Sequence, residues 1–189
     1  NDAVKKVLLP ANSQLNEIII GENASYIHTK TLINSAYSYN ITVINEDASL
    51  INSVTVNYPT FFGHTLNGIL YYADLPEKLN SPTLNGLNIE LWRTNGSSNY
   101  MAYEINRGQQ QLPQNNFVNM PSQPRNFFRL QNKIYFIATN EGKENLYSLN
   151  EDFTFNNGTS NNQWNEGDNW AGQIVPFESD DALIPAGKT

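Results

Sequence analysis

Three observations predict an all-β protein. Aromatic residues make up 12% of the 189 residues, and β-branched residues are common while helix-forming runs are rare. Several runs of six to ten residues alternate apolar and polar side chains, as half-buried strands do. One order of segments, an inner strand, a polar gap and an outer strand, recurs three times along the chain. Together these features favour strands throughout.

The recurring pattern predicts a partial array of propeller-like blades. Its period of about 50 to 65 residues, built from strands alone, is typical of β repeats with variable loops on one rim. The alternative is that short strands in an Asn-rich chain look alike by chance. The inner strands are expected at 15–20, 66–72 and 131–137, and the outer strands at 40–45, 88–93 and 145–150.

The stretch around Asn95-Gly96 predicts a β-hairpin covered on both faces. Asn followed by Gly favours a two-residue type I′ turn, which needs positive φ at both central residues. Thr94 would then face Ser97, Arg93 would face Ser98, and Leu91 would face Tyr100. Apolar residues on both faces indicate a hairpin buried on both sides. One face would hold Ile89, Leu91, Tyr100 and Ala102, and the other Trp92, Met101, Tyr103 and Ile105.

Copies two and three resemble the ELWxxDGT-type repeat of secreted and surface proteins of bacteria. The residues that carry the likeness are 67–74 (NGILYYAD), 89–97 (IELWRTNGS) and 103–106 (YEIN), with 132–138 and 141–147 in the third copy. Asn95 replaces the usual Asp, the third copy lacks the Trp, and the first copy matches only in its strand pattern. The resemblance implies an exported protein and covers roughly residues 60 to 150.

The last part of the chain resembles a second bacterial motif. Residues 164–176 (WNEGDNWAGQIVP) and 179–189 (SDDALIPAGKT) are similar to the opening of a β-solenoid-like segment in secreted multidomain proteins of Bacteroidota. Gly172 comes one residue early and Ala182 stands where Val is usual. In those proteins the segment leads toward a C-terminal sorting domain, so the resemblance implies type IX secretion.

These patterns predict five regions. The polar, low-complexity stretch from 157 to 163 is the expected boundary between the repeats and the second β domain. The regions are a degenerate first repeat (1–58), a second repeat with the Asn-Gly hairpin and a long loop (59–123), a third repeat (124–156), a linker (157–163) and the start of a β-solenoid-like domain (164–189).

Composition excludes several functions. A net charge of −7 disfavours nucleic acids and anionic membrane surfaces, which require Lys/Arg clusters. The absence of Cys excludes disulfides and Cys-based zinc sites. No apolar run approaches membrane-spanning length. Because the chain begins without Met and ends inside a motif, we expect it to be part of a longer chain or a larger assembly.

The sequence predicts no enzymatic activity. His28 and His64 lie far apart, and no nucleophile elbow is present. Carboxylates at Asp47, Asp74 and Asp152 show no spacing that favours a catalytic pair. Glu90 and Glu104 are expected on strand surfaces or at blade rims.

Two stretches are candidate binding sites. The irregular segment 107–124 offers Gln111, Asn115, Asn116 and Phe117 to a ligand, although a plain connection between blades is the favoured alternative. Asp168, Asp180 and Asp181 supply oxygen ligands that Ca²⁺ accepts, but Asx-turns are the favoured alternative. No other cofactor is predicted. The tryptophans at 92, 164 and 170 could stack on sugars, but the core is the expected place for all three.

The function predicted from these patterns is a non-catalytic binding or structural module, an adhesin or scaffold, exposed outside the cell or on the bacterial outer-membrane surface. Its expected partner is a glycan or a protein on the cell surface. The alternative is an accessory region of a secreted carbohydrate-active enzyme.

Overall fold

The all-β prediction is confirmed. The computed structural model describes residues 8–21, 24–44, 49–57, 61–75, 89–111, 117–149, 155–160, 163–165, 169–171, 176 and 182–185, and these contain strands but no α-helix. The strands are β1 (Ser13–Ile19), β2 (Ser25–Ile33), β3 (Ala36–Ile44), β4 (Leu50–Val56), β5 (Phe61–Leu66), β6 (Ile69–Asp74), β7 (Glu90–Thr94), β8 (Asn99–Tyr103), β9 (Gln109–Gln111), β10 (Phe117–Asn119), β11 (Arg125–Leu130), β12 (Lys133–Asn140) and β13 (Lys143–Ser148).

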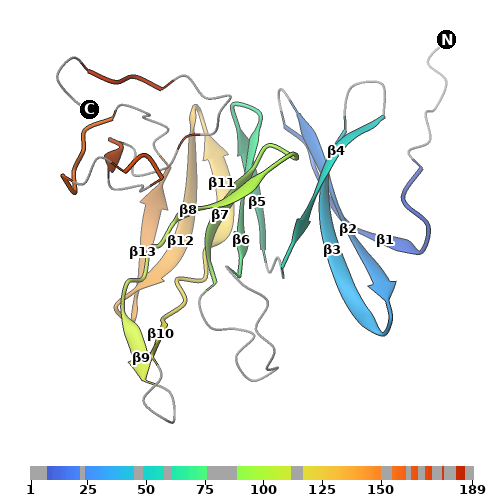
Figure 1. The fold of residues 1–189 in the computed structure, drawn as a ribbon, viewed down its shortest axis with the longest axis horizontal. Coiled ribbons are helices and arrows are strands. Elements are labelled where there is room, and N and C mark those ends of the chain that lie inside the picture. The colour runs from blue at the N-terminus through green and yellow to red at the C-terminus, as the bar shows by residue number, and fades with distance from the viewer. Residues whose placement is uncertain are drawn as a thin grey trace.

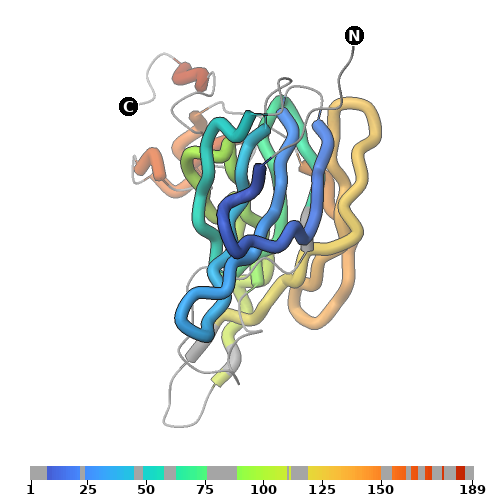
Figure 2. Tube along the Cα trace, turned by 90° about the vertical axis from the view of Figure 1, so that its right-hand side faces the viewer, coloured from blue at the N-terminus to red at the C-terminus, as the bar shows by residue number. Residues whose placement is uncertain are grey.

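Three antiparallel sheets stand side by side in the order of the chain (Figure 1). The first sheet is β1–β4, the second is β5–β8, and the third is β11–β13, each with its strands in sequence order. β9 and β10 form a separate two-stranded ribbon. The first strands β1 and β11 both lie against β5, and the view of Figure 2 looks onto the first sheet with the others behind it. The described strands form an open stack of blade-like sheets.

The repeat is shifted by one strand in the first sheet. Segments 66–72 and 131–137 fall largely on β6 and β12, the second strands of their sheets, whereas 15–20 falls on the edge strand β1. The true counterpart of β6 and β12 is therefore β2. Apolar alternation identifies a strand but does not say which place it takes in its sheet, which is why this equivalence was wrong.

Two apolar cores hold the stack together, and the second sheet contributes to both. Every described residue of β6 and β7 is buried. Sheet-on-sheet packing buries alternate residues of each strand on opposite sides. The prediction of a hairpin covered on both faces is thus confirmed. Toward the first sheet the core comprises Leu70, Tyr72 and Trp92 with Ile19, Tyr26, Ile41, Val43 and Val56; toward the third it comprises Leu66, Ile69, Tyr71, Leu91, Ala102 and Ile105 with Ile134, Phe136, Ala138 and Leu149.

The expected two-residue turn at Asn95-Gly96 is wrong. Arg93 faces Tyr100 and Thr94 faces Asn99, so the loop has four residues, and Gly96 has positive φ (+87°) whereas Asn95 does not. Side chains build this loop: Asn95 Oδ1 accepts hydrogen bonds from the amides of Ser97 and Ser98 at 2.9 and 3.0 Å. Such Asx-turns compete with the backbone turn.

A β-bulge further along the hairpin changes which residues share a face. The register shifts between Leu91 and Trp92, so Leu91 faces Tyr103. Ile105 and Tyr103 consequently pack with Leu91 and Ala102, not with Trp92 as expected, and Tyr100 is 44% exposed. One extra residue on β8 is sufficient for this reversal because side chains alternate with a period of two.

The type I′ geometry occurs elsewhere. Asn67 and Gly68 have φ of 50° and 83° between β5 and β6, within the expected inner strand 66–72. Glu141 and Gly142, which open the 141–147 part of the third copy, have φ of 50° and 74° between β12 and β13. Both match the positive-φ requirement of two-residue hairpin loops.

A small aromatic cluster lies after the third sheet. Phe155 bridges to Trp170, and the Phe155 ring stacks on Trp164 at 5.3 Å. Asn169 is fully buried and its Oδ1 accepts hydrogen bonds from Thr159. The expectation of a core position is correct for Trp170 and for Trp92, but Trp164 is 50% exposed. The division into five regions, with a linker at 157–163, stays a prediction.

Gly96 tests the contact between the first and second sheets. A Cβ at this position would overlap the side chain of Val43 on β3, whereas a Cβ at Gly142 would meet nothing within 4 Å, although both glycines have positive φ. We expect Gly142→Ala to cost about 1 kcal/mol of unfolding free energy through backbone strain alone. Gly96→Ala should cost roughly 1–3 kcal/mol more, because the core must also make room for the methyl group.

Urea unfolding followed by tryptophan fluorescence measures both variants under one condition. The comparison isolates the inter-sheet contact, since the backbone strain is common to the two sites. Equal losses in the two variants would show that Gly96 does not press against the first sheet.

Candidate binding site at the loop rim

One rim of the stack carries most of the irregular chain. In Figure 1 it is the lower edge, where β7 begins, β8 ends, the β9–β10 ribbon projects and β12 turns into β13. We call this edge the loop rim and define it by residues 104–111, 117–124 and 139–142 together with Asp74 and Glu90, which end and begin their strands. Loops on such an edge are positioned by a rigid sheet scaffold.

Glu90 is fully buried at the loop rim, contrary to the expectation of a surface position. Its Oε1 accepts a hydrogen bond from the Ser122 amide at 3.0 Å. Its Oε2 accepts from the Ser122 hydroxyl at 2.6 Å and from the Ile105 amide at 2.9 Å. One carboxyl group therefore holds two irregular segments, 104–108 and 120–124, against the start of β7.

Burial raises the pKa of Glu90 to about 7. The hydrogen bonds from Ser122 and Ile105 oppose this rise because they stabilise the charged form, and the neighbouring carboxylate of Glu104 adds to it. Glu104 in turn accepts a hydrogen bond from Asn119 Nδ2, which ties it to the end of β10.

A buried acid with a raised pKa is also a candidate catalytic group. Glu90, however, has no exposed surface, and both of its oxygens are engaged by donors from the protein. Its register partner Asp74 on β6 is buried in the same way and accepts hydrogen bonds from the amides of Leu75 (2.8 Å) and Asn57 (3.1 Å). The two acids position chain segments at the rim.

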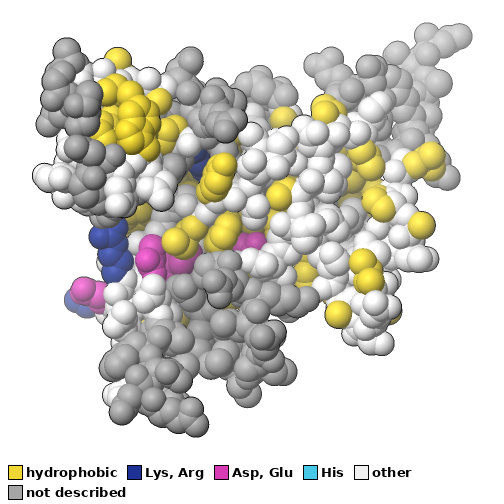
Figure 3. Space-filling view, in the orientation of Figure 1, with side chains coloured by type: hydrophobic (Ala, Val, Ile, Leu, Met, Phe, Trp, Pro, Cys, Tyr) yellow, Lys and Arg dark blue, Asp and Glu magenta, His cyan; other side chains and the backbone are white. Residues whose placement is uncertain are grey.

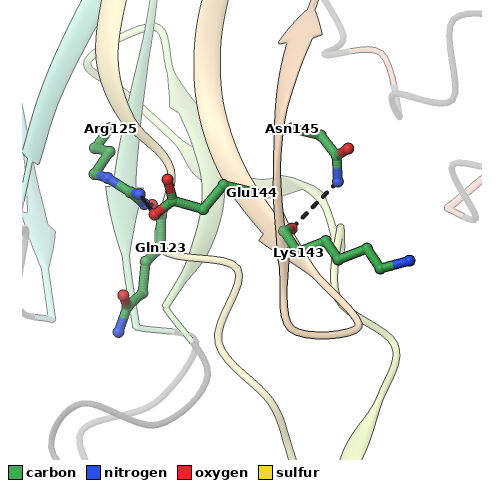
Figure 4. Close-up of polar contacts among 5 residues, drawn as sticks. All are labelled: Gln123, Arg125, Lys143, Glu144 and Asn145. Atoms are coloured by element: carbon green, nitrogen blue, oxygen red, sulfur yellow. Dashed lines mark hydrogen bonds and ion pairs between the residues drawn. The ribbon is translucent and has the colours of Figure 1, made fainter.

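The segment 120–124 also connects the second sheet to the third. The Ser122 carbonyl accepts a hydrogen bond from the Thr139 amide of β12 at 2.7 Å. Figure 4 shows Arg125 between the Gln123 carbonyl, to which Nη1 donates at 3.1 Å, and the carboxylate of Glu144. This segment is held from both sides, so its place on the rim is fixed.

A pocket of about 340 Å³ opens at the rim between the second and third sheets. The end of β8 and the segment after it form one wall, and the β12–β13 turn forms the other. The Arg107 guanidinium lies over the Tyr103 ring at 5.6 Å, within cation–π range. The lining residues are Tyr103, Ile105, Arg107, Gly108, Asn140 and Glu141.

Glu90 holds one wall of this pocket in place through a hydrogen bond. The Ile105 amide that it holds belongs to a lining residue. Gly108, another lining residue, donates its amide to Asn106 Oδ1 at 3.2 Å and accepts from the Met120 amide at 2.8 Å. The pocket wall is therefore built from irregular chain that hydrogen bonds hold in one conformation.

The predicted ligand-contacting residues are only partly placed. Gln111 is exposed on β9, and Phe117 pairs with it on β10, while Asn115 and Asn116 lie outside the described residues. Gln111 is not among the described residues that line the pocket. The calcium candidates Asp168, Asp180 and Asp181 also lie outside the described residues. Within the described ranges, no group of three His, Asp or Glu side chains could hold a metal ion.

The two histidines lie on different sheets. His28 is buried in β2, with its ring stacked on Tyr39 at 5.8 Å, and burial with Lys30 nearby lowers its pKa to about 4. His64 belongs to β5.

The residues that line the pocket were not predicted as ligand-contacting residues from the sequence. Arg107 and Gly108 lie in the candidate segment 107–124 and Glu141 opens a hairpin turn, so all three were visible as loop residues, but none was singled out as a site residue. Their approach depends on the second and third sheets standing face to face, which no local pattern reports.

Comparisons with protein-family models, with curated proteins and with solved structures find no match. The described part of the chain has no helix long and apolar enough to cross a membrane.

Glu90 makes stability depend on pH. Its folded-state pKa of about 7 lies above the ordinary 4.5, so the folded protein binds this proton more tightly than the unfolded chain. The contribution is fully present below about pH 4.5 and is lost as pH rises through about 7. Ionising the buried carboxyl should cost on the order of 3 kcal/mol. Chemical unfolding at a series of pH values between 4.5 and 8 measures the loss.

Glu90→Gln is the matched control. The amide keeps the volume of the side chain but does not titrate, so the decline between pH 4.5 and 8 should flatten even if the variant is less stable. A wild-type decline that persists unchanged in Glu90→Gln would assign the titration to another group.

Proposed function

We propose that this chain is a non-catalytic binding module that engages its partner through the loop rim. The rim pocket carries the proposal. Its volume falls within the range of about 300–1,000 Å³ that is typical of small-ligand sites. Its walls come from two sheets and are held by the buried Glu90 network, so the site exists before a ligand arrives. Such preorganisation lowers the entropy cost of binding.

The lining chemistry favours a polar ligand rich in hydroxyl groups. Asn140 supplies amide donors and acceptors, Glu141 supplies a carboxylate, and Tyr103 supplies an aromatic ring beside Arg107. Sugar units present both hydroxyls and apolar C–H faces, which match this combination. A glycan is therefore the partner that we test first, and a protein surface is the other class.

Binding without turnover agrees with the arrangement of the acids. Glycoside hydrolysis requires two carboxyl groups on either side of the scissile bond. Among the described residues that line the pocket, Glu141 is the one acid, while Glu90 and Asp74 are enclosed by protein donors.

The wider setting of the protein is also a proposal. The three blade-like sheets and the motifs at 67–106 and 164–189 support an exported propeller-like region, displayed on the cell surface as an adhesin or scaffold. The loop rim would then face the medium, as variable loops of repeat proteins do.

A glycan array followed by calorimetry tests the proposal. We expect selective binding of one glycan class, with Arg107→Ala and Asn140→Ala each weakening affinity at least tenfold, about 1.4 kcal/mol. Lys133→Ala, which removes an exposed positive charge from β12 outside the pocket, should leave affinity unchanged. Melting temperatures of all variants confirm that the fold is intact.

Three results would contradict it. Affinity lost equally in Lys133→Ala would place binding elsewhere, and selective binding of a protein with no glycan would change the partner class. Sustained turnover of a chromogenic glycoside, abolished by changing one carboxylate, would make the chain an enzyme.

A further inference from the structure

A second pocket opens on the other side of the second sheet. Its volume is about 280 Å³, close to the lower end of the range of about 300–1,000 Å³ that small-ligand sites have. The β2–β3 hairpin and the end of β4 form its walls, and in Figure 1 β4 ends at the same lower edge of the stack as β6. The lining includes Ile33, Tyr37, Ser38, Thr55, Val56 and Asn57.

Asp74 fixes the wall of this pocket that the end of β4 provides. Its Oδ2 accepts a hydrogen bond from the Asn57 amide at 3.1 Å, and its Oδ1 accepts one from the Leu75 amide at 2.8 Å. The Asn57 side chain reaches the same segment, since its Nδ2 donates to the Leu75 carbonyl at 2.9 Å. The end of β6 therefore holds Asn57 through both its backbone and its side chain.

This arrangement repeats the one at the rim pocket. Asp74 and Glu90 are register partners, both are fully buried, and each accepts a backbone amide from a residue that lines a pocket. The second sheet thus supports one preformed pocket toward the first sheet and another toward the third. Preformed walls favour binding, because little conformational entropy is lost when a ligand enters.

Tyr37 gives this pocket an aromatic surface. Its ring centroid lies 6.3 Å from that of Tyr39, which packs against the core toward the second sheet. The Lys30 ammonium lies 5.2 Å from the Tyr37 ring centroid, within cation–π range. Tyr37 is nevertheless 46% exposed. The ring is therefore positioned by its neighbours and still accessible to a ligand.

The polar part of the lining is uncharged. Ser38 and Thr55 offer hydroxyl groups and Asn57 a side-chain amide, and no lining residue that the structure describes carries a charge. In Figure 3 the visible Lys, Arg, Asp and Glu side chains gather over the second and third sheets, whereas the first sheet, at the right, shows hydrophobic and uncharged ones. Such a lining favours a neutral ligand, because removing an ionised group from water is costly unless it is paired.

We propose that this pocket, the Tyr37 pocket, binds the ring of a neutral sugar. The apolar C–H face of the sugar packs on Tyr37, and its hydroxyls bond to Ser38 and Thr55. Thr55 Oγ1 donates to Asn40 Oδ1 at 3.1 Å, so its lone pairs accept from the ligand. The Tyr37 pocket shares no described lining residue with the rim pocket, which holds Arg107 and Glu141. The proposal therefore stands independently of the function proposed for the rim pocket.

Titration of the chain with methyl glycosides, followed by the NMR shifts of its backbone amides, tests the proposal. The neutral probes are the methyl glycosides of glucose, galactose and mannose, and methyl glucuronide is the charged probe. Wild type should bind at least one neutral glycoside, with the largest shifts around Tyr37 and Ser38. Tyr37→Ala should raise the Kd about tenfold because it removes the stacking surface, whereas Tyr37→Phe, which keeps the ring, should retain binding.

Three further variants locate the site. Tyr100→Ala removes a tyrosine of similar exposure (44%) from β8, outside the pocket, and should leave the Kd unchanged. Arg107→Ala should also leave it unchanged, because Arg107 lines the other pocket. Thr55→Val removes an exposed hydroxyl while keeping the shape of the side chain, and should weaken binding. Thermal melts show which variants are folded, and Thr55→Val decides the test if Tyr37→Ala does not fold.

Four results would overturn the proposal. The first is the absence of saturable binding of any neutral glycoside by wild type, and the second is a Kd unchanged in both Tyr37→Ala and Thr55→Val. An equal loss in Tyr100→Ala or Arg107→Ala would place the sugar elsewhere, and binding of the glucuronide alone would replace the ligand class. None of these results bears on the glycan-array test of the rim pocket, which is read from Arg107→Ala and Asn140→Ala.

Discussion

The carboxyl group of Glu90 is the interaction on which the loop rim depends. A buried acid is costly unless hydrogen bonds replace the water that it loses. Here Ser122 and Ile105 supply three donors, so the same contacts that stabilise the acid also fix two irregular segments. The Ser122 carbonyl also accepts a hydrogen bond from the Thr139 amide of β12, which fixes Ser122 relative to the third sheet. A single side chain thus connects a strand of the second sheet to the third.

The first and second sheets are joined by a comparable polar contact. The hydroxyl of Tyr26, on β2, donates to the Gly68 carbonyl in the turn between β5 and β6, and burial raises the pKa of this tyrosine to about 12. On the same interface Gly96 leaves room for Val43. The stack is therefore held by apolar cores whose register is fixed by a few polar contacts at their margins, where hairpin turns meet neighbouring strands.

The loop rim differs in chemistry from the broad sides of the outer sheets. The rim pocket is polar, lies where strands end, and owes its shape to the Glu90 network. Exposed apolar side chains such as Ile18 on β1 and Leu146 on β13 lie instead on the outer sheets.

The sequence by itself determined what repeats locally. Alternation of apolar residues established the all-β class, and apolar residues on both faces of 89–105 established that this hairpin is covered twice. It did not determine the four-residue loop at Asn95, because the side chains of Thr94 and Asn95 compete with the backbone for the same amides. Nor did it place Glu90 in the interior or Arg107 and Asn140 around one pocket. Those depend on residues up to 33 positions apart meeting across a sheet edge, which only the packing of one sheet on the next decides.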